Sequence, residues 1–206
     1  MASAQLSGCA PSSPPQPRSE PADRPALSSP AARSILLAYF SRPGENYYYG
    51  QRRFLEVGNT EVLAQMISSR IDCDLYRIQP ADPYPEDYSE TVERNVQEQD
   101  ADARPAIAGP LPSLDRYDTV LLASPIWNVR APMIMTTFTE KLDVRGKTIF
   151  PLTTHAMSGL GTTERDYAAS CPGARFGEGL AIRGEEVNGA QAEVDSWLQR
   201  TGLRRA

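Results

Sequence analysis

The sequence is poor in the two residues that most often build catalytic and metal centres. Its 206 residues include one histidine, His155, and three cysteines, Cys9, Cys73 and Cys171. The cysteines are too few and too scattered for a disulfide framework or a tetrahedral zinc site. Any histidine catalysis must use His155, so the sequence predicts no metal centre and at most one histidine-dependent step.

Long apolar runs and clustered positive charge are also missing. No uninterrupted apolar stretch approaches the roughly 18 residues that span a bilayer. The chain has 21 Lys and Arg against 26 Asp and Glu, a formal net charge of -5, without a polybasic block. Nucleic acid is therefore disfavoured as a partner. Hydrophobic residues still make up 40% of the chain, which is enough for the core of one ordinary domain.

The first 33 residues differ in composition from the rest of the chain. Proline, serine and alanine account for 21 of them, seven of each, and none is aromatic. Such a segment cannot bury enough surface to offset the entropy that it loses on ordering. We therefore expect a disordered tether over residues 1–33 and a folded domain over residues 34–206.

The tether contains Leu6-Ser7-Gly8-Cys9, which resembles a bacterial lipobox, where the cysteine is acylated. A lipid on Cys9, followed by a proline-rich spacer, would anchor the chain at the outer face of a bacterial membrane. Only Met1–Gln5 precede the motif, without a basic region or an apolar core of about 7–15 residues. Two interpretations stay open: the start has been clipped from a lipoprotein precursor, or the match is chance and the protein is cytoplasmic.

From residue 34 onward, short apolar runs alternate with segments of helical periodicity. The apolar runs predict five strands, at 35–40, 75–78, 119–123, 148–153 and 176–183. Periodic apolar residues predict helices at about 60–70, 86–99, 132–142, 162–170 and 190–198. Strands that alternate with helices form a parallel sheet. The predicted fold is therefore α/β, a three-layer sandwich with helices on both faces of a five-stranded parallel sheet.

Charged residues indicate the order of these strands. The first, third and fourth strands carry none, as expected where helices cover both faces of a sheet. Arg77 in the second strand, and Glu178 and Arg183 in the fifth, suit the edges. The order 2-1-3-4-5 follows. Pro151 is awkward inside the fourth strand, because proline has no backbone N–H to donate.

Three loops follow the carboxyl ends of the predicted strands. In open parallel sheets, ligands bind beyond these strand ends. The first runs from Ser41 to a helix start at Gly58-Asn59-Thr60, where hydroxyls and free N–H groups suit a phosphate. An ordinary helix cap explains the same residues. No Walker lysine is present, so hydrolysis of a nucleoside triphosphate is disfavoured.

The other two loops each contain one ring side chain. The second, Ser124–Pro132, contains Trp127, which either offers a flat surface to an aromatic ligand or seals the core. The third, His155–Gly161, consists mainly of small residues, which let backbone approach a ligand closely. His155 either contacts that ligand or makes a structural hydrogen bond. The residues alone leave both alternatives open.

Together the three loops resemble those of the flavodoxin family, and the resemblance covers residues 34–206. A strand followed by Ser-x-x-Gly and then Gly-Asn-Thr resembles the family's FMN phosphate loop. Ser-Pro-Ile-Trp-Asn and Thr-His-Ala-Met-Ser-Gly-Leu-Gly resemble its two flavin-flanking loops. The resemblance implies a flavodoxin-like fold with FMN as cofactor. The implied phosphate contacts are Ser41, Arg42, Gly58, Asn59 and Thr60. The implied contacts along the isoalloxazine ring are Pro125, Ile126, Trp127, Asn128, His155, Ser158 and Gly159.

The sequence departs from this family pattern at Glu45–Val57, which appear as an insertion between the two halves of the phosphate loop. The insertion contains Tyr47-Tyr48-Tyr49 and Arg52-Arg53. It forms either a lid over the flavin, with a tyrosine as second stacking partner, or a solvated loop. Beside the ring, the family uses a residue that tolerates positive φ. Asn128 is the best candidate, since asparagine enters the left-handed region more readily than most residues.

The resemblance favours an electron carrier that uses FMN to pass electrons between redox partner proteins. The alternative is an enzyme of the same fold that reduces quinones or similar small acceptors with NAD(P)H. A net charge of -6 on residues 34–206 is milder than a dedicated acidic carrier suggests, which keeps the enzyme open. A flavin-free phosphoacceptor module is disfavoured, because Ala38-Tyr39-Phe40-Ser41 has no acidic residue. A hydrolase is disfavoured because no G-x-S-x-G accompanies His155.

Overall fold

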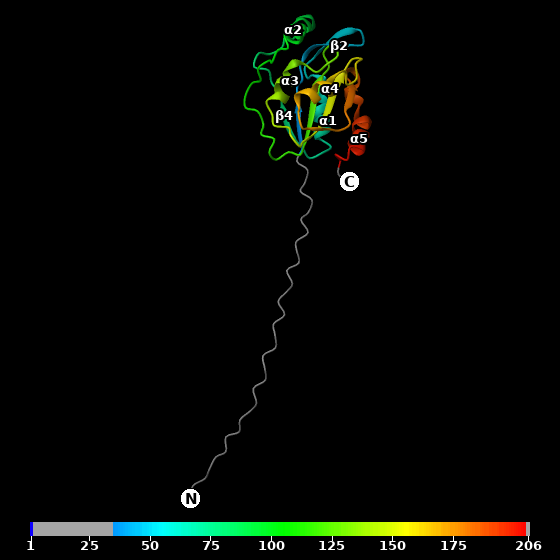
Figure 1. Cartoon of the computed structure of the whole chain (residues 1–206). Helices are drawn as coiled ribbons and strands as arrows, with labels where there is room; N and C mark the ends of the chain where they lie inside the picture. Colours follow the sequence, from blue (N-terminus) through cyan, green and yellow to red (C-terminus); the bar gives the residue numbers. More distant parts are fainter. Residues whose placement is uncertain (2–34, 205–206) are drawn as a thin grey trace. The chain divides into compact units, whose positions relative to one another are not determined.

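The computed structural model describes Met1 and residues 35–204 (Figure 1). The tether and the lipobox match at Cys9 therefore lie outside the described residues, apart from Met1. Among the residues that the structure describes, no helix combines the length and the apolar character that crossing a membrane requires.

A parallel sheet forms the centre of the folded part. Its strands are β1 (Ile35–Tyr39), β4 (Asp74–Arg77), β5 (Thr119–Pro125), β6 (Thr148–His155), β7 (Arg175–Phe176) and β8 (Leu180–Arg183). The order is β4-β1-β5-β6-β7, with β8 also paired to β6, and every pair is parallel. This confirms the predicted α/β class and the order 2-1-3-4-5. The one difference is that the predicted fifth strand is split into β7 and β8.

Pro151 accounts for that split. The Ile149 carbonyl accepts a hydrogen bond from the Gly177 N–H at 2.9 Å, so residue 149 turns its backbone polar groups toward the fifth strand position. Residue 151 faces the same side, because backbone direction alternates along a strand. Proline has no N–H to donate there. The chain leaves the sheet after Phe176 and resumes pairing at Leu180, opposite Leu152.

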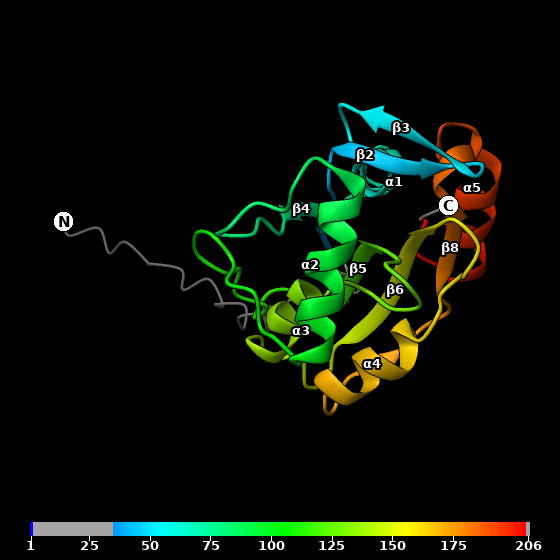
Figure 2. The ribbon, with the colours of Figure 1, turned by 90° about the horizontal axis from the view of Figure 1, so that it is seen from above.

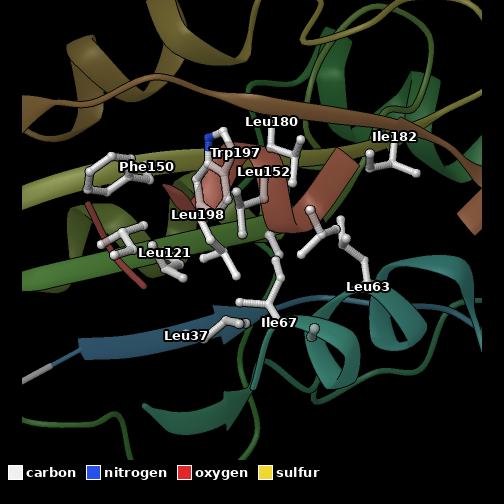
Figure 3. Close-up of a cluster of buried hydrophobic side chains, with 14 of the residues drawn as sticks. Leu37, Leu63, Ile67, Leu121, Phe150, Leu152, Leu180, Ile182, Trp197 and Leu198 are labelled. Atoms are coloured by element: carbon white, nitrogen blue, oxygen red, sulfur yellow. The ribbon is translucent and has the colours of Figure 1, made fainter. Parts of the chain in front are cut away.

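Within the described residues, five α-helices and one short 3-10 helix surround the sheet. They are α1 (Asn59–Ser68), α2 (Tyr88–Asp100), α3 (Met133–Glu140), α4 (Thr163–Ser170), η1 (Gly184–Gly189) and α5 (Gln191–Arg200). Alternate side chains of the strands point to opposite faces. Leu37 and Leu121 pack with Leu63 of α1 and Trp197 of α5 (Figure 3). Leu36, Val120 and Leu122 pack on the other face with α3 and α4, which completes the three layers.

Helix α2 differs from the other four α-helices because none of its residues belongs to either hydrophobic cluster. Its buried residues are instead polar: Thr91, Asn95 and Glu98. The helix lies at the carboxyl ends of the strands, at the upper end of the domain in Figure 1. The apolar side chains of α2 therefore do not pack against the sheet.

The insertion Glu45–Val57 forms an ordered antiparallel hairpin rather than an irregular solvated loop. Its strands are β2 (Gly44–Tyr48) and β3 (Gln51–Leu55), and Figure 2 shows them beside the start of α2. Tyr49 and Gly50 form the two-residue turn with φ of +48° and +84°. Two positive φ values match the twist of a tight hairpin, and glycine adopts such an angle without strain.

Candidate functional site

A cavity of about 550 Å³ opens at the carboxyl ends of β1, β5 and β6, within the size range of cofactor sites. Its strand-end wall comes from the loops after these strands, the start of α1 and η1. The residues of this wall are Ser41, Arg42, Asn59, Pro125, Ile126, Trp127, Asn128, Thr154, His155, Ala156, Met157, Ser158, Gly184 and Glu185. Its hairpin–α2 wall comprises Asn46, Tyr47, Tyr88, Thr91, Val92, Asn95 and Val96.

Ser41 and the start of α1 form the polar end of the strand-end wall. The Glu61 N–H donates to Ser41 Oγ at 3.1 Å, while Gly58 precedes the helix without a side-chain cap. Within residues 35–204, the Asn59 and Thr60 N–H groups donate no hydrogen bond. Unpaired N–H groups at a helix start, with the helix dipole behind them, favour an anion such as a phosphate.

Gly58 allows this close arrangement. A methyl group at Gly58 would lie 2.4 Å from Ser41 Oγ and 2.5 Å from the Arg42 carbonyl oxygen, far inside van der Waals contact. Only glycine lets the end of β1 and the start of α1 approach so closely. Gly58 therefore shapes the polar end without lining the cavity.

Two further residues of the predicted site lie behind the wall rather than in it. Thr60 is buried, and its Oγ1 lies 2.7 Å from Thr154 Oγ1 in a hydrogen bond that ties α1 to the end of β6. The Gly159 carbonyl accepts a hydrogen bond from Thr153 Oγ1 at 3.0 Å. Both residues support cavity-lining neighbours, and the Thr60 backbone N–H remains available to a ligand.

Arg42 has a different set of partners from the phosphate that the family resemblance implies. Its guanidinium donates to the carbonyls of Pro85 at 2.8 Å and Glu86 at 3.1 Å, and also to the Glu45 carbonyl. Burial lowers the pKa of this guanidinium from its usual value, and the Glu45 charge opposes that shift. Arg42 therefore fastens the hairpin to the segment before α2 through its two Nη nitrogens, while its Nε has no partner among the described residues.

Trp127 packs against core residues and also lies on the wall of the cavity. Its half-buried ring packs edge-on against Phe40, with ring centroids 5.6 Å apart, and against Tyr84 at 4.9 Å. It also lines the cavity. Such edge-to-face packing orients the ring, so that Trp127 presents an apolar surface to the cavity.

Asn128 adopts the positive φ that the sequence predicts, at +64°. It belongs to a tight turn closed by a hydrogen bond from the Trp127 N–H to the Arg130 carbonyl at 2.9 Å. Ser158 Oγ donates to the Asn128 carbonyl at 3.3 Å. The two loops that flank the cavity are thereby joined to each other.

His155 ends β6 opposite Arg183 of β8. Burial lowers the pKa of His155, the Arg183 charge lowers it further, and Glu185 acts in the opposite direction. The imidazole is therefore neutral at pH 7. Among the described residues, no hydrogen-bond partner reaches its buried Nδ1.

Sequence analysis offered the hairpin as one alternative for a lid, but it missed the α2 part of the hairpin–α2 wall. Tyr88, Val92 and Val96 indicate a helix by their spacing, and that helix is present, but the stripe faces the cavity instead of the core. Val92 and Val96 are 41% and 45% exposed. The hairpin adds Tyr47, and the Arg52 guanidinium lies 3.6 Å from the centre of the Tyr88 ring. Residues missed in the strand-end wall are Thr154, Ala156, Met157, Gly184 and Glu185.

A scan against protein-family models matches residues 51–201 to a flavodoxin family. The chain belongs to this flavodoxin family. The matched segment begins in the hairpin, at the first residue of β3, and ends just after α5. It therefore includes the start of α1 and both loops that flank the cavity, whereas β1 and Ser41 precede it. A search of curated proteins found no match.

Solved structures support the same flavodoxin assignment. A candidate flavoprotein from Bacteroides uniformis is 30% identical, covering 81% of this chain and 98% of its own, with a TM-score of 0.64. Another from Bacteroides eggerthii is 27% identical, covering 84% of this chain and 100% of its own, with a TM-score of 0.66. A flavoprotein from Lactobacillus acidophilus, solved in complex with FMN, is 18% identical, covers 77% and 98%, and shares the fold at a TM-score of 0.57.

Proposed function

We propose that this flavodoxin-family protein binds FMN in the described cavity and passes electrons between redox partner proteins. The observation that carries the proposal is the division of the cavity into a polar end and an apolar remainder. The free Asn59 and Thr60 N–H groups beside Ser41 lie at one end, and Trp127 lies along the other part. A flavin mononucleotide has the same division, with an anionic phosphate at one end and a flat ring at the other.

The residues present fit this cofactor. Ser41 and the start of α1 would hold the phosphate with neutral donors, while Trp127 and Tyr88 offer aromatic faces to the ring. Bound flavin would supply the redox chemistry, since it accepts and releases one or two electrons. The family assignment and the relative solved with FMN support this choice of cofactor.

The chain itself would control the surroundings of the ring. Neutral His155 adds no positive charge at pH 7, and the stripe of Val92 and Val96 excludes water from that side. The Asn128 turn is held by the hydrogen bond from Ser158, so it keeps its position beside the cavity. Met157 and Val129 are 76% and 49% exposed near the cavity and provide an apolar surface for a redox partner.

A second candidate function is an NAD(P)H-dependent FMN oxidoreductase that acts on quinones or similar small acceptors. The observation that favours it is the hairpin–α2 wall, because an apolar wall across from the strand-end loops suits a second flat ligand. The distinguishing assay mixes the flavin-loaded protein with NADPH and a quinone. Steady NADPH oxidation supports the enzyme, whereas reduction that occurs only through a protein partner supports the carrier.

The test of the proposed function uses the purified full chain. Addition of FMN should give one tightly bound flavin per chain with a shifted visible spectrum, and heating should release FMN unchanged. The loaded protein, reduced with dithionite under anaerobic conditions, should pass its electrons to an added one-electron acceptor protein. A chain that binds neither added FMN nor riboflavin would contradict both candidate functions.

A further inference from the structure

Three buried side-chain atoms of cavity-lining residues lack any hydrogen-bond partner within residues 35–204. They are Nε of Arg42, Nδ1 of His155 and Oε2 of Glu185. His155 and Glu185 lie close together, because β6 and β8 end side by side and η1 follows β8. Buried polar atoms without partners are rare in folded proteins, so a pair of them in one cavity wall points to a ligand that completes their hydrogen bonds.

Glu185 links this wall to the hairpin and to the start of α1. Its Oε1 accepts a hydrogen bond from the Tyr49 N–H at the hairpin tip, at 3.3 Å, which leaves Oε2 without a partner. Gly184 packs against Asn59, since a methyl group at Gly184 would lie 2.4 Å from Asn59 Nδ2. Glu185 therefore directly follows Gly184, which contacts Asn59 at the start of α1.

Charge makes this position unusual for an anion site. Among the described residues that line the cavity, Arg42 and Glu185 are the only charged ones. The two Nη nitrogens of Arg42 donate to backbone carbonyls, while its Nε has no partner among the described residues. A phosphate at the start of α1 would meet the N–H groups of that helix start, while the Glu185 carboxylate repelled it. A hydroxyl group, in contrast, would donate a charge-assisted hydrogen bond to Oε2.

We infer that Glu185 is a specificity-determining residue, which accepts a hydrogen bond from a hydroxyl of the flavin's sugar-alcohol chain and restrains the preference for a phosphorylated flavin. The inference rests on the proposed function. We therefore expect the affinity for FMN to exceed that for riboflavin by a smaller factor than the free N–H groups alone would produce. Removing the charge of Glu185 should increase this factor.

The experiment measures dissociation constants of FMN and of riboflavin for the full chain, by quenching of flavin fluorescence. Glu185→Gln should raise the preference for FMN over riboflavin about tenfold, as expected when one like charge is removed near a phosphate. Glu186→Gln is the matched control. Glu186 belongs to the same 3-10 helix and also contacts Tyr49, but it is exposed and does not line the cavity. In this control the preference should stay within about twofold.

A second variant separates charge from hydrogen bonding. Glu185→Ala should raise the preference for FMN as Glu185→Gln does, and it should also weaken riboflavin binding, because no acceptor remains for the hydroxyl. An unchanged preference in both Glu185 variants, or an equal change in Glu186→Gln, would overturn the inference alone. If the unmodified chain bound neither flavin, the proposed function would fall together with it.

Discussion

The two walls of the cavity are built in different ways. The strand-end wall follows from the parallel sheet itself, because β1, β5 and β6 end at one edge and their loops must meet there. The hairpin–α2 wall is added from outside the sheet. It is attached through the carbonyl contacts of Arg42 and through the bonds of the hairpin tip to η1. One wall is therefore positioned by the strands of the core, whereas the other is attached through a few polar contacts.

The largest expected effect comes from breaking the attachment of the hairpin–α2 wall with Arg42→Met. The substitution removes the hydrogen bonds that the guanidinium donates to the Glu45, Pro85 and Glu86 carbonyls, so we expect the free energy of unfolding to fall by about 3 kcal/mol. Hydrogen exchange should accelerate in β2 and β3 and stay slow in β5.

The control for this prediction is Arg53→Met. Arg53 lies in the same hairpin and is exposed, with its guanidinium 4.9 Å from the centre of the Tyr48 ring. Its loss should change the free energy of unfolding by no more than about 0.5 kcal/mol. If β2 and β3 of Arg42→Met stayed as protected as β5, the hairpin would not depend on Arg42.

A smaller effect is expected when the strand-end wall is broken with Gly58→Ala. The added methyl group would overlap Ser41 Oγ and the Arg42 carbonyl, which must move apart. Overpacking of this kind lowers the free energy of unfolding by about 1–3 kcal/mol, and FMN affinity should fall at least tenfold. Chemical denaturation and FMN titration measure the two effects. Gly189→Ala is the control, because no atom lies within 4 Å of its added methyl group.

Part of the candidate site could be predicted from the amino-acid sequence alone. The positions of Trp127, Asn128 and His155 were predictable because parallel strands place their carboxyl ends together. The positive φ of Asn128 followed from the conformational preference of asparagine. The strand order followed from charges at the sheet edges.

The hairpin–α2 wall could not be predicted in the same way. The periodicity of Tyr88, Val92 and Val96 identifies a helix with one apolar face, but a core and a ligand produce the same pattern. The partners of Arg42 are Pro85 and Glu86, which are 43 and 44 residues away. No local pattern reports such a contact. The family resemblance implies a phosphate contact for Arg42, which stays a prediction, and it does not report these carbonyl contacts.

An intermediate effect, on binding alone, should come from Val92→Asn. Val92 is exposed in the free protein, so the free energy of unfolding should change by less than about 0.5 kcal/mol. FMN affinity should fall about threefold to tenfold, because the apolar contact with the ring is lost. Val57→Asn is the comparison, since Val57 is similarly exposed at 46% but lies outside the cavity wall. Equal loss of affinity in both variants would show that α2 does not contact the flavin.

The smallest effect concerns pH and His155. Because the folded pKa of His155 lies below the unfolded value of 6.5, the unfolded chain binds the proton more tightly. The free energy of unfolding should therefore decrease as the pH falls through 6.5. In His155→Gln this component should be absent, and no other histidine obscures the comparison. Urea denaturation at pH 7.5 and pH 5.5 measures it, and identical pH dependence in both proteins would contradict the expected shift.

The most direct test of the account is a crystal structure of the full chain with FMN. The account predicts the phosphate at the Asn59 and Thr60 N–H groups beside Ser41, with the ring against Trp127 and facing the stripe of α2. It would be contradicted by a flavin bound elsewhere on the molecule, or by a cavity that stays empty at saturating FMN.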